Sequence, residues 1–315
     1  MGIVPDTVQW LQDLLGPDVR LNEPMSRHTS FRIGGPADVW ARPRDVNTLV
    51  RLIRGAGERQ IPFVVIGDGT NLLVRNSGIR GLVITLTGGF REITHTGEYP
   101  DGIRLTTGAG CRLQRFCRQA VDQGLAGLNF ALGIPGTMGG AIRMNAGTRL
   151  GWMSDVLREV RVLQPDGTEG ILRRVDMDFS YRTLSWKPGT IEGGEEPIIL
   201  EGTFCLTPED PAFLKNEATE IIEDRRARQP TRLPSAGCFF KNPPDQEPAG
   251  RLIEAAGMKG KRIGDAEVSR RHANFIVNRK HASAADILSL MEWIQEEVKK
   301  KYDIDLEPEV QIVGS

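Results

Sequence analysis

The sequence has few of the features that mark specialised classes of protein. Of its 315 residues, 40 are Lys or Arg and 41 are Asp or Glu, so the formal net charge is −1. This balance gives no long-range attraction for nucleic acid, and we expect no nucleic-acid partner. The four cysteines are widely spread, and neither they nor the four histidines are arranged at zinc spacing. We therefore expect reduced thiols and no metal.

Long apolar runs are also absent. The longest uncharged stretch, residues 123–142, has 20 residues, but six of them are glycine and one is Pro135, which predicts a loop-rich segment and no membrane span. The first residues, MGIVPDTVQWLQDLL, carry an acid at Asp6 and no basic segment before an apolar one, so no secretory signal is indicated. We expect a monomeric, cytoplasmic protein without membrane contact.

The pattern of elements predicts a mixed α and β protein in three parts. Residues 1–31 indicate one amphipathic helix and an extended lead-in. From residue 37 a strand, a helix capped by Asp45 and a short β-branched strand form one βαβ unit. A long helix that starts at Pro211 and is stopped by Pro230 opens the last part. We expect domains at 1–31, 32–207 (lobes of about 32–84 and 85–207) and 208–315.

Further strands and helices follow from local patterns. Residues 103–110 indicate a strand that leads into a helix ending at Gly124, and residues 158–175 indicate two strands joined by a turn. A strand is expected at 198–206. The last helix is capped by Ser283 and precedes a closing strand in IDLEPEVQIVG.

Two glycine-rich segments are candidate ligand loops. GIPGTMGGAIRMNAG, residues 133–147, has five glycines in fifteen residues, and GDGTN begins at Gly67. Glycine lets the backbone approach a ligand closely, so several amides can converge on an anion such as a pyrophosphate. A set of tight turns would explain the same glycines. The dinucleotide fingerprint of the doubly wound fold does not fit GDGTN, because a third glycine and a directly following helix are missing.

The segment AGCFFKNP raises a question about Cys238. A thiol close to Lys241 and Asn242 is either ordinary core packing or an acid that delivers a proton. Arginines at the end of the helix before Pro230 are favoured there by the helix dipole, which by itself explains them. His272 is expected to pack against Phe275.

Seven motifs in a fixed order carry a resemblance to a known family. They are HTSFRIGGPAD, VIGDGTNLLV, GIPGTMGGAIRMNAG, AGCFFKNP, GRLIEAAGMKG, HANFIVN and LEPEV. In this order the chain resembles the UDP-N-acetylenolpyruvoylglucosamine reductases, also called UDP-N-acetylmuramate dehydrogenases, over residues 27–313. It is similar to the shorter bacterial form, which lacks an inserted tyrosine-bearing loop.

The resemblance implies a fold and a reaction. The fold is α+β, a three-lobed FAD-binding fold of the vanillyl-alcohol-oxidase (PCMH) type with a C-terminal α/β substrate-binding lobe. FAD is the cofactor and NADPH the co-substrate. The reduced flavin delivers hydride to the β carbon of an enolpyruvyl ether on a UDP-sugar, in peptidoglycan precursor synthesis, and an acid then protonates the α carbon.

The resemblance also assigns residues to roles. The catalytic set is Arg182, Cys238 as proton donor, and Glu309. Substrate recognition falls on Arg225, Lys241 and Asn242, with Arg228 a close competitor of Arg225. The cofactor-binding set is Gly67, Asp68, Gly69, Thr70, Asn71, Gly133, Ile134, Pro135, Gly136, Thr137, Gly140, Ala141 and Asn145.

Three positions depart from the family pattern. Serine is usual at Cys238, and a serine is usual at Leu184, where this chain has Ser185 shifted by one. Arg143 stands where an apolar residue is common. Only the first departure affects the chemistry, because a free thiol, with a pKa of about 8.5, gives up a proton more readily than a hydroxyl.

Other functions remain open from the sequence. A flavin oxidase of the same wider fold would be reoxidised rapidly by oxygen and would need no UDP-sugar. A non-catalytic flavin or UDP-sugar binding protein would hold ligand without turnover. A cysteine hydrolase built on Cys238 and His272 lacks an evident oxyanion loop and a third orienting residue.

Overall fold

The computed structural model describes residues 4–191 and 196–314, which divide into two compact units. Unit 1 comprises Met1–Arg20, Trp40–Gly67 and Leu82–Asp224, and unit 2 comprises Leu21–Val39, Asp68–Gly81 and Arg225–Ser315. Each unit is therefore assembled from separate stretches of the chain. The three-part boundaries expected from the sequence stay a prediction.

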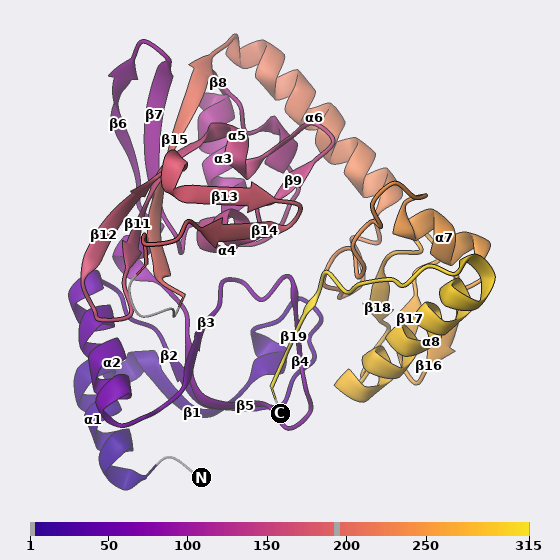
Figure 1. The fold of residues 1–315 in the computed structure, drawn as a ribbon, viewed down its shortest axis with the longest axis horizontal. Helices are drawn as coiled ribbons and strands as arrows, with labels where there is room; N and C mark the ends of the chain where they lie inside the picture. Colours follow the sequence, from indigo (N-terminus) through magenta and orange to yellow (C-terminus); the bar gives the residue numbers. More distant parts are fainter. Residues whose placement is uncertain (1–3, 192–195, 315) are drawn as a thin grey trace. The chain divides into compact units, whose positions relative to one another are not determined.

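Runs of strands are separated by single helices or helix pairs along the chain (Figure 1). The α-helices are α1 Pro5–Leu15, α2 Val46–Glu58, α3 Leu113–Asp122, α4 Met138–Arg143, α5 Met153–Val156, α6 Pro211–Arg228, α7 Ala249–Ala255 and α8 Ala284–Tyr302. The strands of the first half are β1 Val19–Pro24, β2 Pro36–Ala41, β3 Phe63–Val65, β4 Leu72–Val74, β5 Ile79–Ile84, β6 Ile93–Tyr99, β7 Gly102–Gly108, β8 Leu125–Ala126, β9 Gly147–Thr148 and β10 Gly151–Trp152. Those of the second half are β11 Leu157–Leu163, β12 Glu169–Arg173, β13 Met177–Ser180, β14 Thr183–Trp186, β15 Ile198–Pro208, β16 Arg262–Ile263, β17 Ala266–Val268, β18 Ile276–Asn278 and β19 Gln311–Val313.

The main sheet of unit 1 has the strand order β12-β11-β15-β7-β6, and these neighbours are antiparallel. Helices α3 and α4 lie on the same face of β15 (Figure 1). Phe116 of α3 packs on Phe204 with ring centroids 5.1 Å apart, and a Cβ added to Gly202 would lie 2.8 Å from Ile142 Cδ1 of α4. Because residues two apart in a strand face the same side, Gly202 and Phe204 together seat both helices.

A second sheet has the order β1-β2-β5-β3, with β3 and β5 parallel. The expected strand, helix and strand of the βαβ unit are present as β2, α2 and β3, and β5 lies between the two strands. The expected cap of α2 is confirmed, since the Asp45 side chain accepts from Thr48 N–H at 2.8 Å. Helix α1 packs on α2 through Trp10, and a Cβ added to Gly55 would lie 2.2 Å from its ring.

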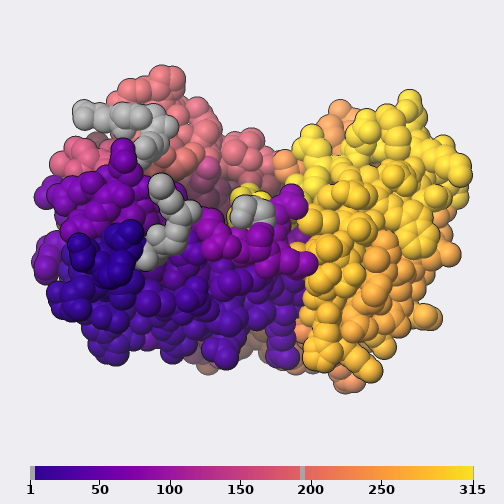
Figure 2. All heavy atoms as spheres, turned by 90° about the horizontal axis from the view of Figure 1, so that it is seen from below, coloured from indigo at the N-terminus to yellow at the C-terminus, as the bar shows by residue number. Residues whose placement is uncertain are grey.

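The core of unit 2 packs against one side of α8. Ile287, Leu290 and Ile294 of α8 are fully buried with Phe239 and Phe240, which are each 1% exposed. On the face drawn in Figure 2, the C-terminal residues in yellow form much of the surface of unit 2. The helix is therefore buried along one side and exposed along the other.

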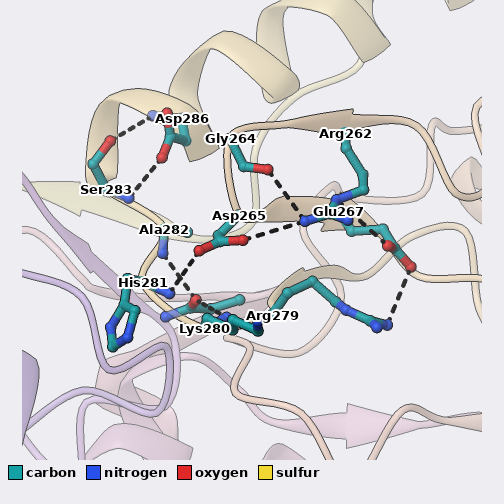
Figure 3. Close-up of polar contacts among 11 residues, drawn as sticks. Arg262, Gly264, Asp265, Glu267, Arg279, Lys280, His281, Ala282, Ser283 and Asp286 are labelled. Carbon is teal, nitrogen blue, oxygen red and sulfur yellow. Dashed lines mark hydrogen bonds and ion pairs between the residues drawn. The ribbon is translucent and has the colours of Figure 1, made fainter.

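The start of α8 is held by polar contacts that Figure 3 draws. Ser283 and Asp286 form a capping box, as the sequence predicts for the cap at Ser283. Before it, Asp265 accepts from the main-chain N–H of His281 at 3.2 Å and from Arg262 at 3.2 Å. These bonds fix the turn between β18 and α8.

The closing strand is shorter than expected. Of IDLEPEVQIVG, only β19 is a strand, and it pairs in parallel with β4. Pro308 has no N–H to donate, and it makes only an isolated bridge to Phe240. Among residues 4–191 and 196–314, no helix is both long and apolar enough to cross a membrane.

The buried carboxylate of Asp18 is the centre of an ion network in unit 1. Arg44 donates two hydrogen bonds to it, Arg42 lies 2.8 Å away, and the bond from Arg44 holds the pKa of Asp18 below its usual value. Because that pKa is depressed in the folded state, the stabilisation is present above the ordinary carboxyl pKa and is lost as pH falls through the folded pKa. We expect Asp18→Asn to lower the urea midpoint at pH 7 and to approach wild type only at a pH below the folded-state pKa, which lies under the ordinary carboxyl value. Asp13→Asn, at an exposed position of α1, is the control; an equal loss at both pH values would contradict the pKa argument.

Candidate functional site

The glycine-rich segment 133–147 forms a turn and the short helix α4. Thr137 is the N-cap and its Oγ1 accepts from Gly140 N–H at 3.4 Å. Gly133 and Gly136 have φ of 78° and 120°, a region that side chains with a Cβ rarely adopt. The carbonyl of Gly136 accepts from Leu113 N–H at 2.9 Å, which joins this segment to the start of α3. The tight turns are thus part of unit 1, whether or not a ligand is bound.

Two of the predicted cofactor segments meet at Thr137. A Cβ added to Gly67 would lie 2.3 Å from Thr137 Oγ1, so only glycine allows this approach. A Cβ added to Gly140, by contrast, would meet only Thr137 Oγ1, at 3.6 Å. The backbone at Gly140 therefore has an open side, and this glycine is not required by protein packing. A glycine backbone with open space beside a threonine hydroxyl fits a phosphate-bearing cofactor.

After Gly67 the chain passes into unit 2, where Gly69 and Asn71 have packing roles of their own. Gly69 has φ of 61°, and a Cβ there would lie 2.0 Å from the carbonyl oxygen of His28. The Asn71 side chain donates to the carbonyl of Glu309 at 3.0 Å. The family resemblance places Asn71 in the cofactor-binding set. In unit 2 one hydrogen of its amide bonds to the backbone carbonyl of Glu309, a predicted catalytic residue.

Arg182 lies at the tip of the hairpin formed by β13 and β14. It has φ of 59°, and its guanidinium lies 5.4 Å and 5.0 Å from the ring centroids of Trp152 and Tyr181. Its Nη1 donates to the carbonyl of Gly147 at 3.1 Å. The side chain is therefore held in one place by aromatic packing and a hydrogen bond, which is unlike a solvated surface arginine.

Asn145 connects the glycine-rich segment to this hairpin. Its side chain is 4% exposed and donates to the carbonyl of Ser180 at 3.1 Å, while its Oδ1 accepts from Ser154 N–H at 3.1 Å. Ser180 pairs with Thr183 across the tip that carries Arg182. Within unit 1, a predicted cofactor residue thus supports the segment of a predicted catalytic residue.

Two of the three departures from the family pattern contact each other. Arg143 Nη1 donates to the carbonyl of Leu184, and Nη2 lies 2.8 Å from Glu196 Oε1. The Leu184 side chain is 1% exposed. The arginine therefore anchors α4 to β14, and its unusual identity has a structural partner in the same unit.

Cys238 and Glu309 lie on paired segments of unit 2. The N–H of Glu309 donates to the carbonyl of Phe239 at 2.8 Å, and Phe240 bridges Pro308. Cys238 is half-buried, whereas the other three cysteines are buried. Burial raises the pKa of the Cys117 thiol to about 12, whereas Cys238 is less buried than Cys117.

The substrate-recognition candidates lie close to Cys238 in sequence or at the end of α6. Lys241 Nζ lies 3.2 Å from Glu307 Oε2, and the side-chain oxygen of Asn242 accepts from Ala249 N–H, near the start of α7, at 3.1 Å. Arg225 and Arg228 are both in the last turn of α6; Arg225 is half-buried and Arg228 exposed. Lys241 and Asn242 bind other protein groups, and Arg228 is exposed. The binding roles of these side chains stay predictions.

The expected packing of His272 is confirmed. Its ring lies 5.0 Å from that of Phe275, and burial lowers the pKa of the imidazole. Its Nδ1 accepts from Asn274 N–H at 3.2 Å. Sequence reasoning did not single out Asn274, although a buried asparagine inside the apolar segment HANFIVN was a signal. No group of three or more His, Cys, Asp or Glu in the described parts of the chain is placed to hold a metal ion.

Comparison with known proteins first defines the class. A family profile described as "FAD binding domain" matches residues 37–171. A VAO-type flavoprotein from Myceliophthora thermophila aligns with a TM-score of 0.50 at 14% identity, over 65% of this chain and 48% of its own. With the open backbone at Gly140, these matches define an FAD-binding protein with a fold of the vanillyl-alcohol-oxidase type, and the expected fold class and cofactor are confirmed.

The family follows from closer relatives. A profile described as "UDP-N-acetylenolpyruvoylglucosamine reductase, C-terminal domain" matches residues 229–313. The enzyme of that name from Desulfosudis oleivorans is 45% identical over 97% of this chain and 98% of its own, and the one from Heliobacterium modesticaldum is 44% identical over 97% and 91%. The crystal structure of the Thermus caldophilus UDP-N-acetylenolpyruvylglucosamine reductase aligns with a TM-score of 0.78 at 35% sequence identity. The alignment covers 94% of this chain and 98% of that one. The chain belongs to the UDP-N-acetylenolpyruvoylglucosamine reductase family.

Gly140 allows a test of the cofactor segment that does not disturb the fold. Alanine is more favourable than glycine in a helix by roughly 0.5–1 kcal/mol, and the added Cβ meets no close protein atom. We expect Gly140→Ala to keep or raise the thermal stability of the flavin-free protein and to reduce the bound FAD per chain. Gly57→Ala, in α2 with nothing near its Cβ, is the control. Full FAD content in Gly140→Ala, measured by the visible spectrum, would argue against cofactor contact here.

Proposed function

We propose that this protein catalyses the NADPH-dependent reduction of UDP-N-acetylglucosamine enolpyruvate to UDP-N-acetylmuramate in the cytoplasm, as a step of peptidoglycan precursor synthesis. The observation that supports this most directly is that the Cys238 and Glu309 segments are paired in a chain of this family. The N–H of Glu309 donates to the carbonyl of Phe239 at 2.8 Å. A proton donor and a carboxyl group are therefore carried by adjacent backbones of unit 2.

Cys238 has the role of proton donor. The chemistry that bound FAD supplies is the transfer of a hydride from NADPH to the β carbon of the enol ether. The product then needs one proton at the α carbon, and the Cys238 Sγ–H supplies it. A half-buried thiol suits this role, because it can reach a ligand and still be shielded from bulk water. Solvent returns the proton to the sulfur after each turnover.

Arg182 and Glu309 stabilise the substrate carboxylate as charge develops on it. Groups already oriented before the reaction are the most effective, since they need no rearrangement in the transition state. Arg182 is oriented by Tyr181, Trp152 and the carbonyl of Gly147. The backbone of Glu309 is held from both sides, by Asn71 on its carbonyl and by Phe239 on its N–H.

Arg225, Lys241 and Asn242 recognise the anionic groups of the UDP-sugar. Charge-assisted hydrogen bonds from arginine and lysine give both affinity and register. The half-burial of Arg225 favours it over the exposed Arg228, because a partly desolvated guanidinium interacts more strongly with a phosphate. Lys241 exchanges its contact with Glu307 for one with substrate.

The Cys238 assignment has a direct test. Cys238→Ala removes the donor and is expected to slow reduction of the UDP-sugar by about a hundred- to ten-thousand-fold, the usual contribution of a general acid. Cys238→Ser keeps a donor and should retain substantial activity while losing the alkaline fall that ionisation of a thiol causes. Bleaching of the flavin by NADPH should be unchanged in both, as stopped-flow absorbance would measure. Wild-type turnover by Cys238→Ala would return the cysteine to a packing role.

The carboxylate-binding roles are tested by separating the two half-reactions. Arg182→Ala and Glu309→Ala are expected to slow reoxidation of the reduced flavin by the UDP-sugar far more than its reduction by NADPH, because both side chains are assigned to the substrate carboxylate. Glu292→Ala, at an exposed position of α8, is the control and should change neither step more than about twofold. Equal slowing of both half-reactions would count against the assignment.

A further inference from the structure

Asn274 makes three hydrogen bonds to the residues that follow Cys238. Its Oδ1 accepts from Phe240 N–H at 2.9 Å, and its Nδ2 donates to the Phe240 carbonyl at 2.8 Å. Its own carbonyl accepts from Phe239 N–H at 2.7 Å. The side chain is 3% exposed. An amide that both accepts from and donates to one residue has a single workable orientation, so this pair acts like a short stretch of β-ladder.

The same two phenylalanines are held on a second side by the segment of Glu309. Phe239 accepts from Glu309 N–H, and Phe240 bridges Pro308. Their rings are 1% exposed in the core of unit 2, so neither the backbone nor the side chains can shift easily. Residues 239 and 240 are thus fixed between residue 274 and residues 308–309.

Cys238 directly precedes this fixed pair. The residue before it, Gly237, has φ of 81° and nothing within 4 Å of a Cβ built on it. The bonds at Phe239 and Phe240 therefore hold the backbone on one side of the thiol. An apolar residue at 274 would leave the buried N–H and carbonyl of Phe240 without these partners, and buried main-chain groups are rarely left unpaired.

We propose that Asn274 is a positioning residue: its amide holds Phe239 and Phe240 so that the thiol of Cys238 and the backbone of Glu309 keep a fixed spacing. The inference rests on the proposed function for its catalytic consequence, and on unit 2 alone for its geometry. Asn274 itself exchanges no proton with substrate.

The chain offers a matched control in Asn278. It is also 3% exposed, lies four residues further on, and makes three hydrogen bonds with its side chain. These bonds go to the carbonyl of Phe31 and to the N–H groups of Lys280 and Ala282, in the turn drawn in Figure 3. Asn278→Ala should therefore cost similar stability while leaving every hydrogen bond of Phe239 and Phe240 in place.

The first measurement is the rate at which a small aromatic disulfide labels the native FAD-loaded protein. Because the other three cysteines are buried, the fast thiol is that of Cys238, which Cys238→Ser confirms by abolishing the fast phase. We expect Asn274→Ala to raise this rate at least about tenfold and Asn278→Ala to leave it within about twofold, since a clamp of several hydrogen bonds is lost only in the first. The labelling rate of Asn274→Asp, which keeps the acceptor for Phe240 N–H, should fall between the rates of wild type and Asn274→Ala. This variant serves as the test if Asn274→Ala does not fold.

The second measurement separates positioning from general loosening. In Asn274→Ala, reoxidation of the reduced flavin by the UDP-sugar should slow by about a hundredfold, the effect of a displacement of about 1 Å at a reacting group, while reduction by NADPH stays near wild type. Wild-type labelling and reoxidation in both Asn274 variants would overturn the proposal, and so would equal changes in Asn278→Ala. If Cys238→Ala turned over normally, the proposed donor would be wrong, but the labelling rates would still decide whether Asn274 positions the thiol.

Discussion

The hydrogen bond from Glu309 N–H to Phe239 is the contact on which the functional part of unit 2 depends. It joins the segment of the half-buried cysteine to the segment of the C-terminal glutamate. Asn71 holds the other side of Glu309, and Asn274 the other side of Phe239 and Phe240. Because each partner is itself buried or paired, the two segments can hardly slide past each other, and the spacing of their side chains is set by the backbone.

The constraint in unit 1 is different, because the backbone of its glycine-rich segments has to leave room for the proposed cofactor. Gly67 is required by Thr137, and positive φ is required at Gly133 and Gly136, but Gly140 is required by no protein atom. Protein packing or backbone conformation therefore requires the first three of these glycines but not Gly140. We propose close approach of FAD as the reason for Gly140, because the chain matches an FAD-binding domain and close approach of a ligand is the other common use of glycine.

Substitutions that look unusual within the family are accommodated locally. Arg143 donates to the backbone carbonyl of Leu184, 41 positions further on, and the Leu184 side chain is buried, so each departure has its own local contacts. The cysteine at 238 is neither fully buried nor part of the core cluster of unit 2. This partial exposure is consistent with the role of proton donor that we propose for it.

The amino-acid sequence by itself determined the periodic and the local features of this protein. The caps Asp45 and Ser283, the helix stopped before Pro230 and the packing of His272 on Phe275 depend on neighbours a few residues away, and ordered motifs sufficed to name the family and its candidate residues. Only the tertiary structure decided which of these residues support one another. The bond from Asn71 to Glu309 spans 238 positions and that from Asn274 to Phe240 spans 34. Such pairs carry no periodic signal, because a buried amide finds its partner only after the chain has folded and water has been excluded from both groups.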